Sequence, residues 1–220
     1  MASDRRIPTP AADTAHGAET RAVRHLSGDP VMAELIATLP PPKPGTSAGL
    51  YIDLIDAIAS QQLSVRAAAS IMDRFLDLFP DRRPTPEEVL ERSDEELRAV
   101  GLSRPKVRYI RGIAEAISSG EFDLERLHDL PDDEVIEHLT ALKGVGRWTA
   151  EMLLIFSLRR PDVFSLGDLG LRNAVARHYG VDRDDHEAIR AISERWSPHR
   201  STASRYLWAS LANTPVSDSR

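Results

Sequence analysis

The sequence predicts an all-α fold. Apolar residues recur three and four positions apart, the spacing of one helix face, in residues 50–63, 65–79, 106–117, 149–158 and 201–211. Strand-like alternation of apolar and polar residues is nearly absent. Cap-like residues followed by acids open further short helices at residues 84–90, 93–100 and 130–139. We therefore expect roughly ten helices, many of them short.

The composition indicates a soluble globular protein. The 220 residues are 41% hydrophobic and 28% charged, and no apolar run approaches the roughly eighteen residues of a membrane span. The absence of cysteine excludes disulfides, thiolate zinc sites, a cysteine nucleophile and a cysteine-ligated iron–sulfur cluster. Any catalysis must use oxygen, nitrogen or imidazole groups, and we expect no membrane partner.

Two segments lie outside the helical pattern. Residues 1–20 are polar, rich in Ala, Thr and Pro, and lack the apolar core of a secretory signal peptide. We expect them to form a flexible tail on a cytoplasmic protein. In residues 38–49, four prolines within five positions cannot continue a helix, so this segment is the candidate boundary between two subdomains.

The formal net charge of −6 argues against nucleic acid as a partner, because phosphate binding depends on Lys and Arg. The charge is segregated, however. Residues 98–111 carry five basic side chains and no acidic one, whereas residues 121–137 carry eight acidic side chains and only Arg126 as a base. An acidic protein can therefore have a basic face, although ordinary solvated helix surface is the alternative. The five basic residues are Arg98, Arg104, Lys106, Arg108 and Arg111.

The most informative stretch is residues 139–158, where Gly144-Val145-Gly146 separates two helices. Glycines permit positive φ and close backbone approach, and the exposed amides, with the first turn of the next helix, can hold a phosphate without reading a base. A plain helical hairpin with a glycine cap is the alternative. The longer string from Leu142 to Ala150 resembles the helix-hairpin-helix signature of the DNA base-excision glycosylase superfamily. On that resemblance the phosphate-binding residues are Gly144, Gly146, Arg147 and Thr149.

Asp168 begins an amphipathic helix that continues through Leu171, Val175 and Tyr179, so it is a candidate N-cap. In the superfamily, an aspartate at this distance after the hairpin is the catalytic carboxylate, and the lead-in at residues 162–164 also matches. Cleavage of an N-glycosidic bond builds positive charge on the deoxyribose, which a fixed anion in a water-poor pocket stabilises. A helix N-terminus favours the ionised carboxylate, so the cap and catalytic interpretations are compatible.

Trp148 bears on the reaction type. On the resemblance, superfamily members that also cut the DNA backbone differ from this chain here, because they carry a lysine that forms a Schiff base with the sugar. Tryptophan has no amine, and Lys143 on the hairpin looks poorly placed to replace that lysine. The resemblance therefore implies a monofunctional enzyme that leaves an intact abasic site.

Two further segments resemble the family's tools for base flipping. Residues 57–68 are similar to the turn that fills the gap left by the flipped base, with Gln62 as the expected plug and Leu63 as the less favoured neighbour; a polar capping turn is the alternative. Residues 194–211 are similar to the last helices of alkylbase glycosylases. Trp208 would line the base pocket with Trp148 and Met152, because aromatic faces attract cationic alkylated bases, whereas Trp196 is assigned mainly to packing.

Together these segments resemble the DNA-3-methyladenine glycosylase II branch of the superfamily. The resemblance implies two helical subdomains with the active site in the cleft between them: residues 51–160 carry the plug turn and hairpin, and residues 21–50 with 161–215 carry Asp168. One departure is residues 165–167, Ser-Leu-Gly, where many relatives have a proline and a second acid.

The resemblance also implies the ligands and partners. We expect no catalytic cofactor, but a monovalent cation, Na⁺ or K⁺, held in the hairpin by the backbone carbonyls of Thr140, Leu142 and Val145. The partner is double-stranded DNA containing a damaged base, and the protein is expected to be a monomer, nucleoid-associated if bacterial. The alternatives are a non-catalytic helix-hairpin-helix DNA-binding protein and a glycosylase for etheno, deaminated, oxidised or mismatched bases.

Overall fold

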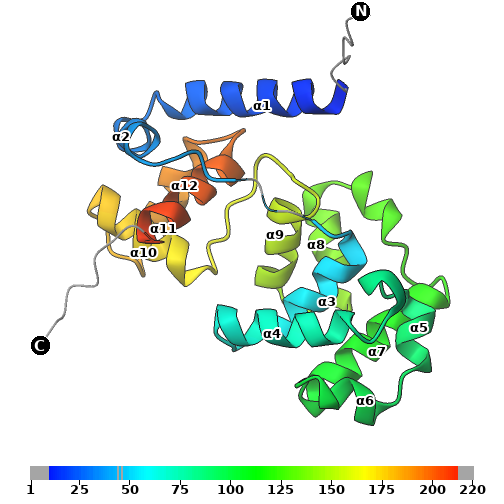
Figure 1. The fold of residues 1–220 in the computed structure, drawn as a ribbon. Helices are drawn as coiled ribbons and strands as arrows, with labels where there is room; N and C mark the ends of the chain where they lie inside the picture. The colour runs from blue at the N-terminus through cyan, green and yellow to red at the C-terminus, as the bar shows by residue number, and fades with distance from the viewer. Residues whose placement is uncertain (1–9, 44, 46, 213–220) are drawn as a thin grey trace, which may run out of the picture. The chain divides into compact units, whose positions relative to one another are not determined.

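The computed structural model describes residues 10–43, 45 and 47–212, with the backbone alone for residues 10–16 and 212. Every regular element in these ranges is helical: there are twelve α-helices, two short 3-10 helices and no strand (Figure 1). The all-α prediction is confirmed, although the periodicity indicated somewhat fewer helices. In the same ranges, no helix is both long enough and apolar enough to cross a lipid bilayer.

The chain divides into two compact units. The inner unit is the continuous stretch Pro44–Arg160, and the terminal unit joins Met1–Lys43 to Pro161–Arg220. The resemblance predicts residues 44–50 in the terminal subdomain, but they belong to the inner unit. Gly45 lies so close to Phe156 that an added β-carbon would come within 3.0 Å of the ring, and Arg159 Nη2 donates to the Gly45 carbonyl at 3.5 Å. These contacts draw the end of the proline-rich linker onto the inner unit.

The terminal unit contains α1 (Pro10–Leu26), α2 (Pro30–Thr38), α10 (Leu169–Tyr179), α11 (His186–Glu194) and α12 (Arg200–Ala212). α12 packs against α1, α2 and α10, so helices from both ends of the chain share one core (Figure 1). Trp196 is fully buried in that core, which agrees with its assignment to packing. The other core residues are Leu26, Met32, Leu35, Leu171, Ala174, Val175, Ile189, Ile192, Ala203, Tyr206 and Leu207.

The expected flexible tail over residues 1–20 is wrong for its second half. α1 begins at Pro10, where a proline suits the first turn of a helix, and alanines at positions 11, 12, 15 and 18 favour helix formation. Glu19 is held by an ion pair with Arg205 of α12 at 2.9 Å. Residues 1–9 lie outside the described residues.

The inner unit contains α3 (Leu50–Ser60), α4 (Val65–Leu76), α5 (Pro86–Glu91), α6 (Asp94–Ala99), α7 (Arg104–Ser118), α8 (Asp132–Ala141) and α9 (Arg147–Phe156), with the 3-10 helices η1 (Pro80–Arg82) and η2 (Glu125–His128). α7 packs against α3, α5 and α6, while α3 also contacts α4 and α9. α7 and α3 therefore hold the plug segment and the hairpin on one scaffold.

The predicted helix starts are correct at α5 and α6 but not in detail at α8. Thr85 with Glu88, and Ser93 with Glu96, form reciprocal capping boxes, which satisfy amides that a helix start leaves unpaired. α8 is different, because its N-cap is Pro131 and makes no side-chain cap. Its first turn instead carries three acids, Asp132, Asp133 and Glu134, which favour the positive end of the helix dipole.

A polar brace fixes the start of α12 to the segment that leads into α10. Asp162 accepts hydrogen bonds from Arg200 Nε at 2.8 Å, Arg200 Nη2 at 3.0 Å and Ser197 Oγ at 2.8 Å. Ser201 adds a bond from its amide to the Pro161 carbonyl at 3.0 Å. The Asp-Val-Phe lead-in thus has a structural role, because it aligns α12 with α10.

Acidification should weaken this brace. Burial raises the pKa of the Asp162 carboxyl, but hydrogen bonds from Arg200 and Ser197 outweigh it, so the pKa lies below its usual value. A carboxylate with a lowered folded-state pKa stabilises the fold above its unfolded pKa and loses that contribution as pH falls through the folded one. Asp162→Asn should lower the free energy of unfolding by about 1–3 kcal/mol at neutral pH. The deficit should shrink below about pH 4.

Urea unfolding of wild type and Asp162→Asn across this pH range measures the effect. Asp129→Asn is the matched control, because Asp129 is exposed and its side chain has no hydrogen bond or ion pair within the described ranges. A deficit that stays constant with pH would show that the brace does not depend on the ionised carboxylate.

Candidate active site and DNA-binding elements

Asp168 is the N-cap of α10, as its position in the sequence predicts. Its Oδ1 accepts a hydrogen bond from the Leu171 amide at 2.7 Å. The same oxygen accepts a second bond from Trp208 Nε1 of α12 at 3.0 Å. Two donors from different helices therefore meet at one carboxylate oxygen at the start of α10.

Trp208 has a contact that the sequence did not reveal. It was predicted as a wall of the base pocket on the strength of its aromatic face, and that role stays a prediction. The structure adds that its indole N–H is directed at the candidate catalytic oxygen, while its ring packs against the terminal core. Trp208 can therefore orient Asp168.

The space beside this pair depends on Gly170. An added β-carbon there would lie 3.0 Å from Asp168 Oδ1 and 3.4 Å from Trp208 Cδ1. The backbone of Gly170 does not require positive φ, so its missing side chain matters for room rather than for conformation. Leu169, next to Asp168, is a large apolar side chain that is 52% exposed and that the sequence pattern did not indicate as part of the site. Its signal was an apolar residue at the first position of a helix.

The hairpin between α8 and α9 requires glycine at position 144 for two reasons, the backbone conformation and the space available. Gly144 has a φ of 92°, which is unfavourable for other residues. A β-carbon there would lie 2.5 Å from Cδ2 of Tyr109 on α7. Gly146, the N-cap of α9, makes no side-chain cap, so the α9 N-terminus presents its dipole and backbone without a competing side chain.

The other predicted phosphate contacts differ in exposure. The Arg147 side chain is 69% exposed and pairs with Glu151 at 2.9 Å, so it can reach a phosphate. Thr149 is only 3% exposed, which argues against a phosphate contact through its hydroxyl. On the same helix Trp148 is 45% exposed, and Met152 is half-buried one turn later. The predicted pocket residues Trp148 and Met152 thus belong to the inner unit, whereas Trp208 and Asp168 belong to the terminal unit.

The plug segment between α3 and α4 is a tight turn. The Leu63 amide donates to the Ser60 carbonyl at 3.1 Å, and Gln61 has φ −49° and ψ 131°. Gln62 follows with a φ of 58°, the left-handed position that glycine normally takes in a type II turn. A glutamine kept in a costly conformation at an exposed tip is the arrangement expected of a functional side chain.

The tip of the turn is apolar beyond the two residues that were predicted. Leu63 is 40% exposed, and Val65, the first residue of α4, is 88% exposed. Sequence reasoning missed Val65 because it fits the apolar periodicity of α4. Its exposure shows that the first turn of α4 contributes to the surface around Gln62.

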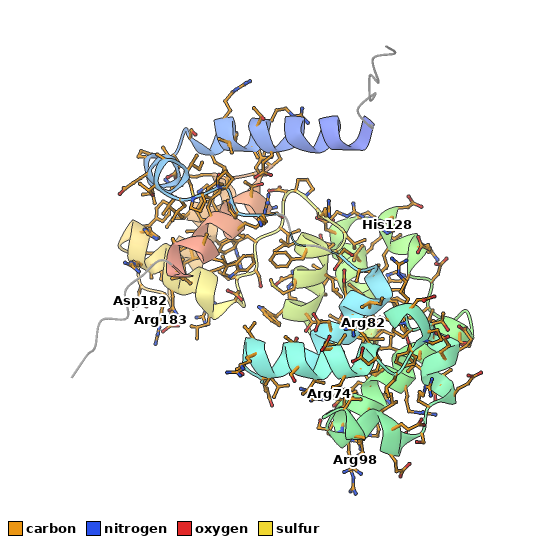
Figure 2. All side chains as sticks on the ribbon, viewed as in Figure 1. Arg74, Arg82, Arg98, His128, Asp182 and Arg183 are labelled. Atoms are coloured by element: carbon orange, nitrogen blue, oxygen red, sulfur yellow. The ribbon has the colours of Figure 1, made fainter. Side chains whose placement is uncertain are left out.

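The five basic side chains of residues 98–111 do not form one continuous surface. Arg98, Arg104 and Arg108 are exposed, and Figure 2 shows Arg98 projecting from the inner unit. Arg111 instead donates to the Arg92 carbonyl at 2.6 Å. Lys106 is also turned toward backbone carbonyls. The charge pattern alone therefore overstated the basic face.

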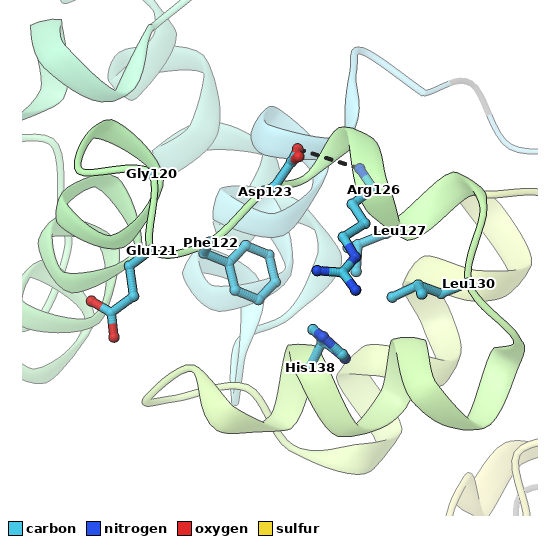
Figure 3. A pocket seen from close by; sticks show the side chains of 8 residues that line it. All are labelled: Gly120, Glu121, Phe122, Asp123, Arg126, Leu127, Leu130 and His138. Carbon is cyan, nitrogen blue, oxygen red and sulfur yellow. Dashed lines mark hydrogen bonds between the residues drawn. The ribbon is translucent and has the colours of Figure 1, made fainter.

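A cavity of about 300 Å³ lies elsewhere in the inner unit, where η2 faces α8 (Figure 3). Charged and apolar side chains line it in nearly equal measure, and none of the predicted site residues is among them. It is therefore not the predicted base pocket. The lining residues are Gly120, Glu121, Phe122, Asp123, Arg126, Leu127, Leu130 and His138.

Comparison with known proteins identifies the family. Residues 55–199 match the family model described as HhH-GPD superfamily base excision DNA repair protein. The chain belongs to the HhH-GPD superfamily. The matched range contains the plug turn, the hairpin and Asp168.

Similar proteins place the chain in the alkylbase branch of this superfamily. DNA-3-methyladenine glycosylase 1 of Schizosaccharomyces pombe is 38% identical over 196 residues, which cover 86% of each chain. The structure resembles the DNA-3-methyladenine glycosidase of Bacillus halodurans, with a TM-score of 0.79 and 34% identity over 87% of this chain and 89% of that one. It also resembles the S. pombe enzyme Mag1 in complex with abasic DNA, with a TM-score of 0.76 and 38% identity over 86% and 95% of the two chains.

The backbone of the plug turn should carry measurable strain. Gln62→Gly should raise the free energy of unfolding by about 0.5 kcal/mol, because relief of about 1–2 kcal/mol of left-handed strain exceeds the entropy cost of glycine. Leu63→Gly is the matched control and should lower stability by about 0.5–1 kcal/mol, because Leu63 does not have positive φ. Urea unfolding of both variants decides the matter, and a loss of stability in Gln62→Gly would mean that the turn is relaxed.

Proposed function

We propose that this HhH-GPD protein is a monofunctional DNA glycosylase that flips alkylated purines, such as 3-methyladenine, out of duplex DNA and removes them by hydrolysis. The observation that carries the proposal is the Asp168 carboxylate held by both the α10 N-terminus and the Trp208 indole. A module that only binds DNA needs neither contact. Relatives named DNA-3-methyladenine glycosylases support the choice of alkylated bases.

Asp168 acts as the fixed anion in the proposed reaction. N3- or N7-alkylation makes the base cationic, so the N-glycosidic bond breaks with its electron pair and the base leaves as a neutral molecule. The positive charge moves to the sugar, where the carboxylate stabilises it without reorganising. Water then adds to the sugar carbon, and its proton is released to solvent. The Leu171 amide and the Trp208 N–H hold the carboxylate in position for this role.

The inner unit supplies recognition in this proposal. Gln62, supported by Leu63 and Val65, fills the gap that the extruded base leaves in the duplex. This contact offsets part of the free energy needed to unstack the base. The hairpin amides at Gly144 and Gly146, together with Arg147, hold the backbone phosphate. Trp148 and Met152 provide apolar and aromatic contact for a cationic base. The partner is double-stranded DNA with a damaged base, bound by a monomer in the cytoplasm, or at the nucleoid of a bacterium.

Three lysines bear on the absence of lyase activity, which needs an amine to attack the sugar. Lys106 donates to two backbone carbonyls, Lys43 precedes the inner unit, and Lys143 is an exposed residue of the hairpin. Trp148 takes the position at which the family's lyases carry their lysine. The product should therefore be an intact abasic site.

A monovalent cation, Na⁺ or K⁺, fits the hairpin in the same proposal. Among the described residues, no donor hydrogen-bonds to the carbonyls of Thr140 or Val145, and the Leu142 carbonyl accepts only the Val145 amide at 3.1 Å. These oxygens retain lone pairs that a cation can use. The ion would add positive charge beside the bound phosphate, and the reaction itself needs no further cofactor.

The test is base release from methylated duplex DNA. Wild type should release methylpurines and leave strands that break only after hot alkali treatment, whereas Asp168→Asn should fold normally and lose release by about 100-fold or more. Chromatography identifies the bases, and denaturing gels with and without alkali report the strands. Asparagine keeps the N-cap, so a loss of activity reflects the lost charge.

The other outcomes separate the alternatives. Release from etheno, deaminated or mismatched DNA but not methylated DNA would change the substrate class. Strand breaks without alkali would overturn the monofunctional assignment. Binding to abasic-analogue DNA without release from any lesion would show a non-catalytic DNA-binding protein.

A second measurement isolates the Trp208 donor. Trp208→Phe keeps an aromatic ring but removes the N–H that meets Asp168, so single-turnover base release should slow by about 10-fold or more. Affinity for abasic-analogue DNA should change much less, because the ring and the plug turn remain. Equal release by Trp208→Phe and wild type would assign Trp208 to the pocket wall alone.

A further inference from the structure

A half-buried lysine on α7 contacts the plug turn. Lys106 Nζ donates to the carbonyl of Ala59 at 2.8 Å and to that of Gln61 at 2.8 Å. Both carbonyls lie at the C-terminal end of α3, where the last carbonyls of a helix lack partners within it. A cation is favourable at this negative end of the helix dipole. Lys106 thus caps the C-terminal end of α3 immediately before Gln62.

A second bond joins the plug turn to the hairpin. Gln61 Nε2 donates to the Gly144 carbonyl at 2.9 Å, across 83 positions of sequence. Gly144 in turn packs directly on the ring of Tyr109, which lies one turn after Lys106 on α7. The two turns are therefore tied to the same helix and to each other.

Lys106 is placed here at an energetic cost. It is half-buried, and this burial lowers the pKa of its ammonium group. It has no ion-pair partner among the described residues. Two neutral carbonyls only partly replace the water that the ammonium loses. A lysine needed only for charge would lie on the surface, as Lys43 and Lys143 do.

We propose that Lys106 and Gln61 are positioning residues that hold the plug turn in register with the hairpin. Gln62 then enters the duplex at a fixed distance from the phosphate that the hairpin binds. The left-handed backbone of Gln62 is maintained by these contacts on the residues before it, as strained conformations require. The inference rests on the proposed function in one respect, namely that Gln62 is the plug.

The experiment measures plug insertion without base release. Binding is titrated on duplex DNA containing a tetrahydrofuran abasic analogue with 2-aminopurine as its neighbour, whose fluorescence rises when stacking is disturbed. Intact duplex gives the non-specific affinity. The variants are Lys106→Met, Gln62→Ala and the double variant. Lys43→Met is the matched control, because it removes the same charge from an exposed position.

Lys106→Met should lose about 10-fold in affinity for abasic DNA and most of the fluorescence change, while Lys43→Met should stay within about 2-fold of wild type. The double variant should bind no more weakly than Gln62→Ala alone, because Lys106 acts through Gln62. Lys106→Arg keeps the charge and donors and should restore part of the loss.

Additive losses in the double variant, or equal losses in Lys106→Met and Lys43→Met, would overturn the inference. If Lys106→Met does not fold, Gln61→Ala takes its place in the same cycle, since it removes the bond to Gly144 and leaves Lys106 with its two carbonyl partners. Non-additive losses without methylpurine release would leave this inference standing and reject the proposed function. Additive losses together with normal methylpurine release would reject this inference and leave the proposed function standing.

Discussion

One oxygen of Asp168 satisfies two demands of the fold, and the candidate chemistry depends on both. It caps the first turn of α10 and receives the indole N–H of α12, so two helices far apart in sequence meet at a single carboxylate. The Asp162–Arg200 brace and the bond from Ser201 to Pro161 fix the start of α12. A change that moved α12 would therefore alter the helix cap and the environment of the anion together.

In the inner unit, one helix, α7, likewise contacts both of the turns that were predicted from the sequence. Lys106 and Tyr109 lie one turn apart on that helix, and they contact the plug turn and the hairpin respectively. Gly144 leaves room for the ring of Tyr109. Gln61 donates a hydrogen bond to the Gly144 carbonyl and so joins the two turns. Both turns are thus held by contacts with α7 and with each other, which suits residues that are proposed to meet DNA at set positions.

Local patterns in the sequence were sufficient for most of the fold. Helix periodicity and the capping boxes at Thr85 and Ser93 depend on residues within four positions of each other, and the structure confirms them. The segment after Pro10 was misjudged because its helix is secured by Glu19 meeting Arg205, a contact across most of the chain. Asp168 was identified as a cap from local pattern and as a catalytic candidate from resemblance.

The details of the candidate site were harder to foresee. The Trp208 donor lies 40 positions from Asp168, and the clamp of Lys106 spans about as far. No periodicity encodes such pairs. Val65 illustrates a different limit, because an apolar residue in an amphipathic helix looks like core until the fold shows it at the surface.

The division of the chain also orders its assembly. The inner unit is one continuous segment, so all its partners have been synthesised once residue 160 leaves the ribosome. The terminal core needs α1 and α2 from the beginning and α12 from near the end, and a domain closes only when its distant segments are present. A growing chain therefore carries the plug turn and the hairpin, which are proposed to contact DNA, well before Trp208 is synthesised and can meet Asp168.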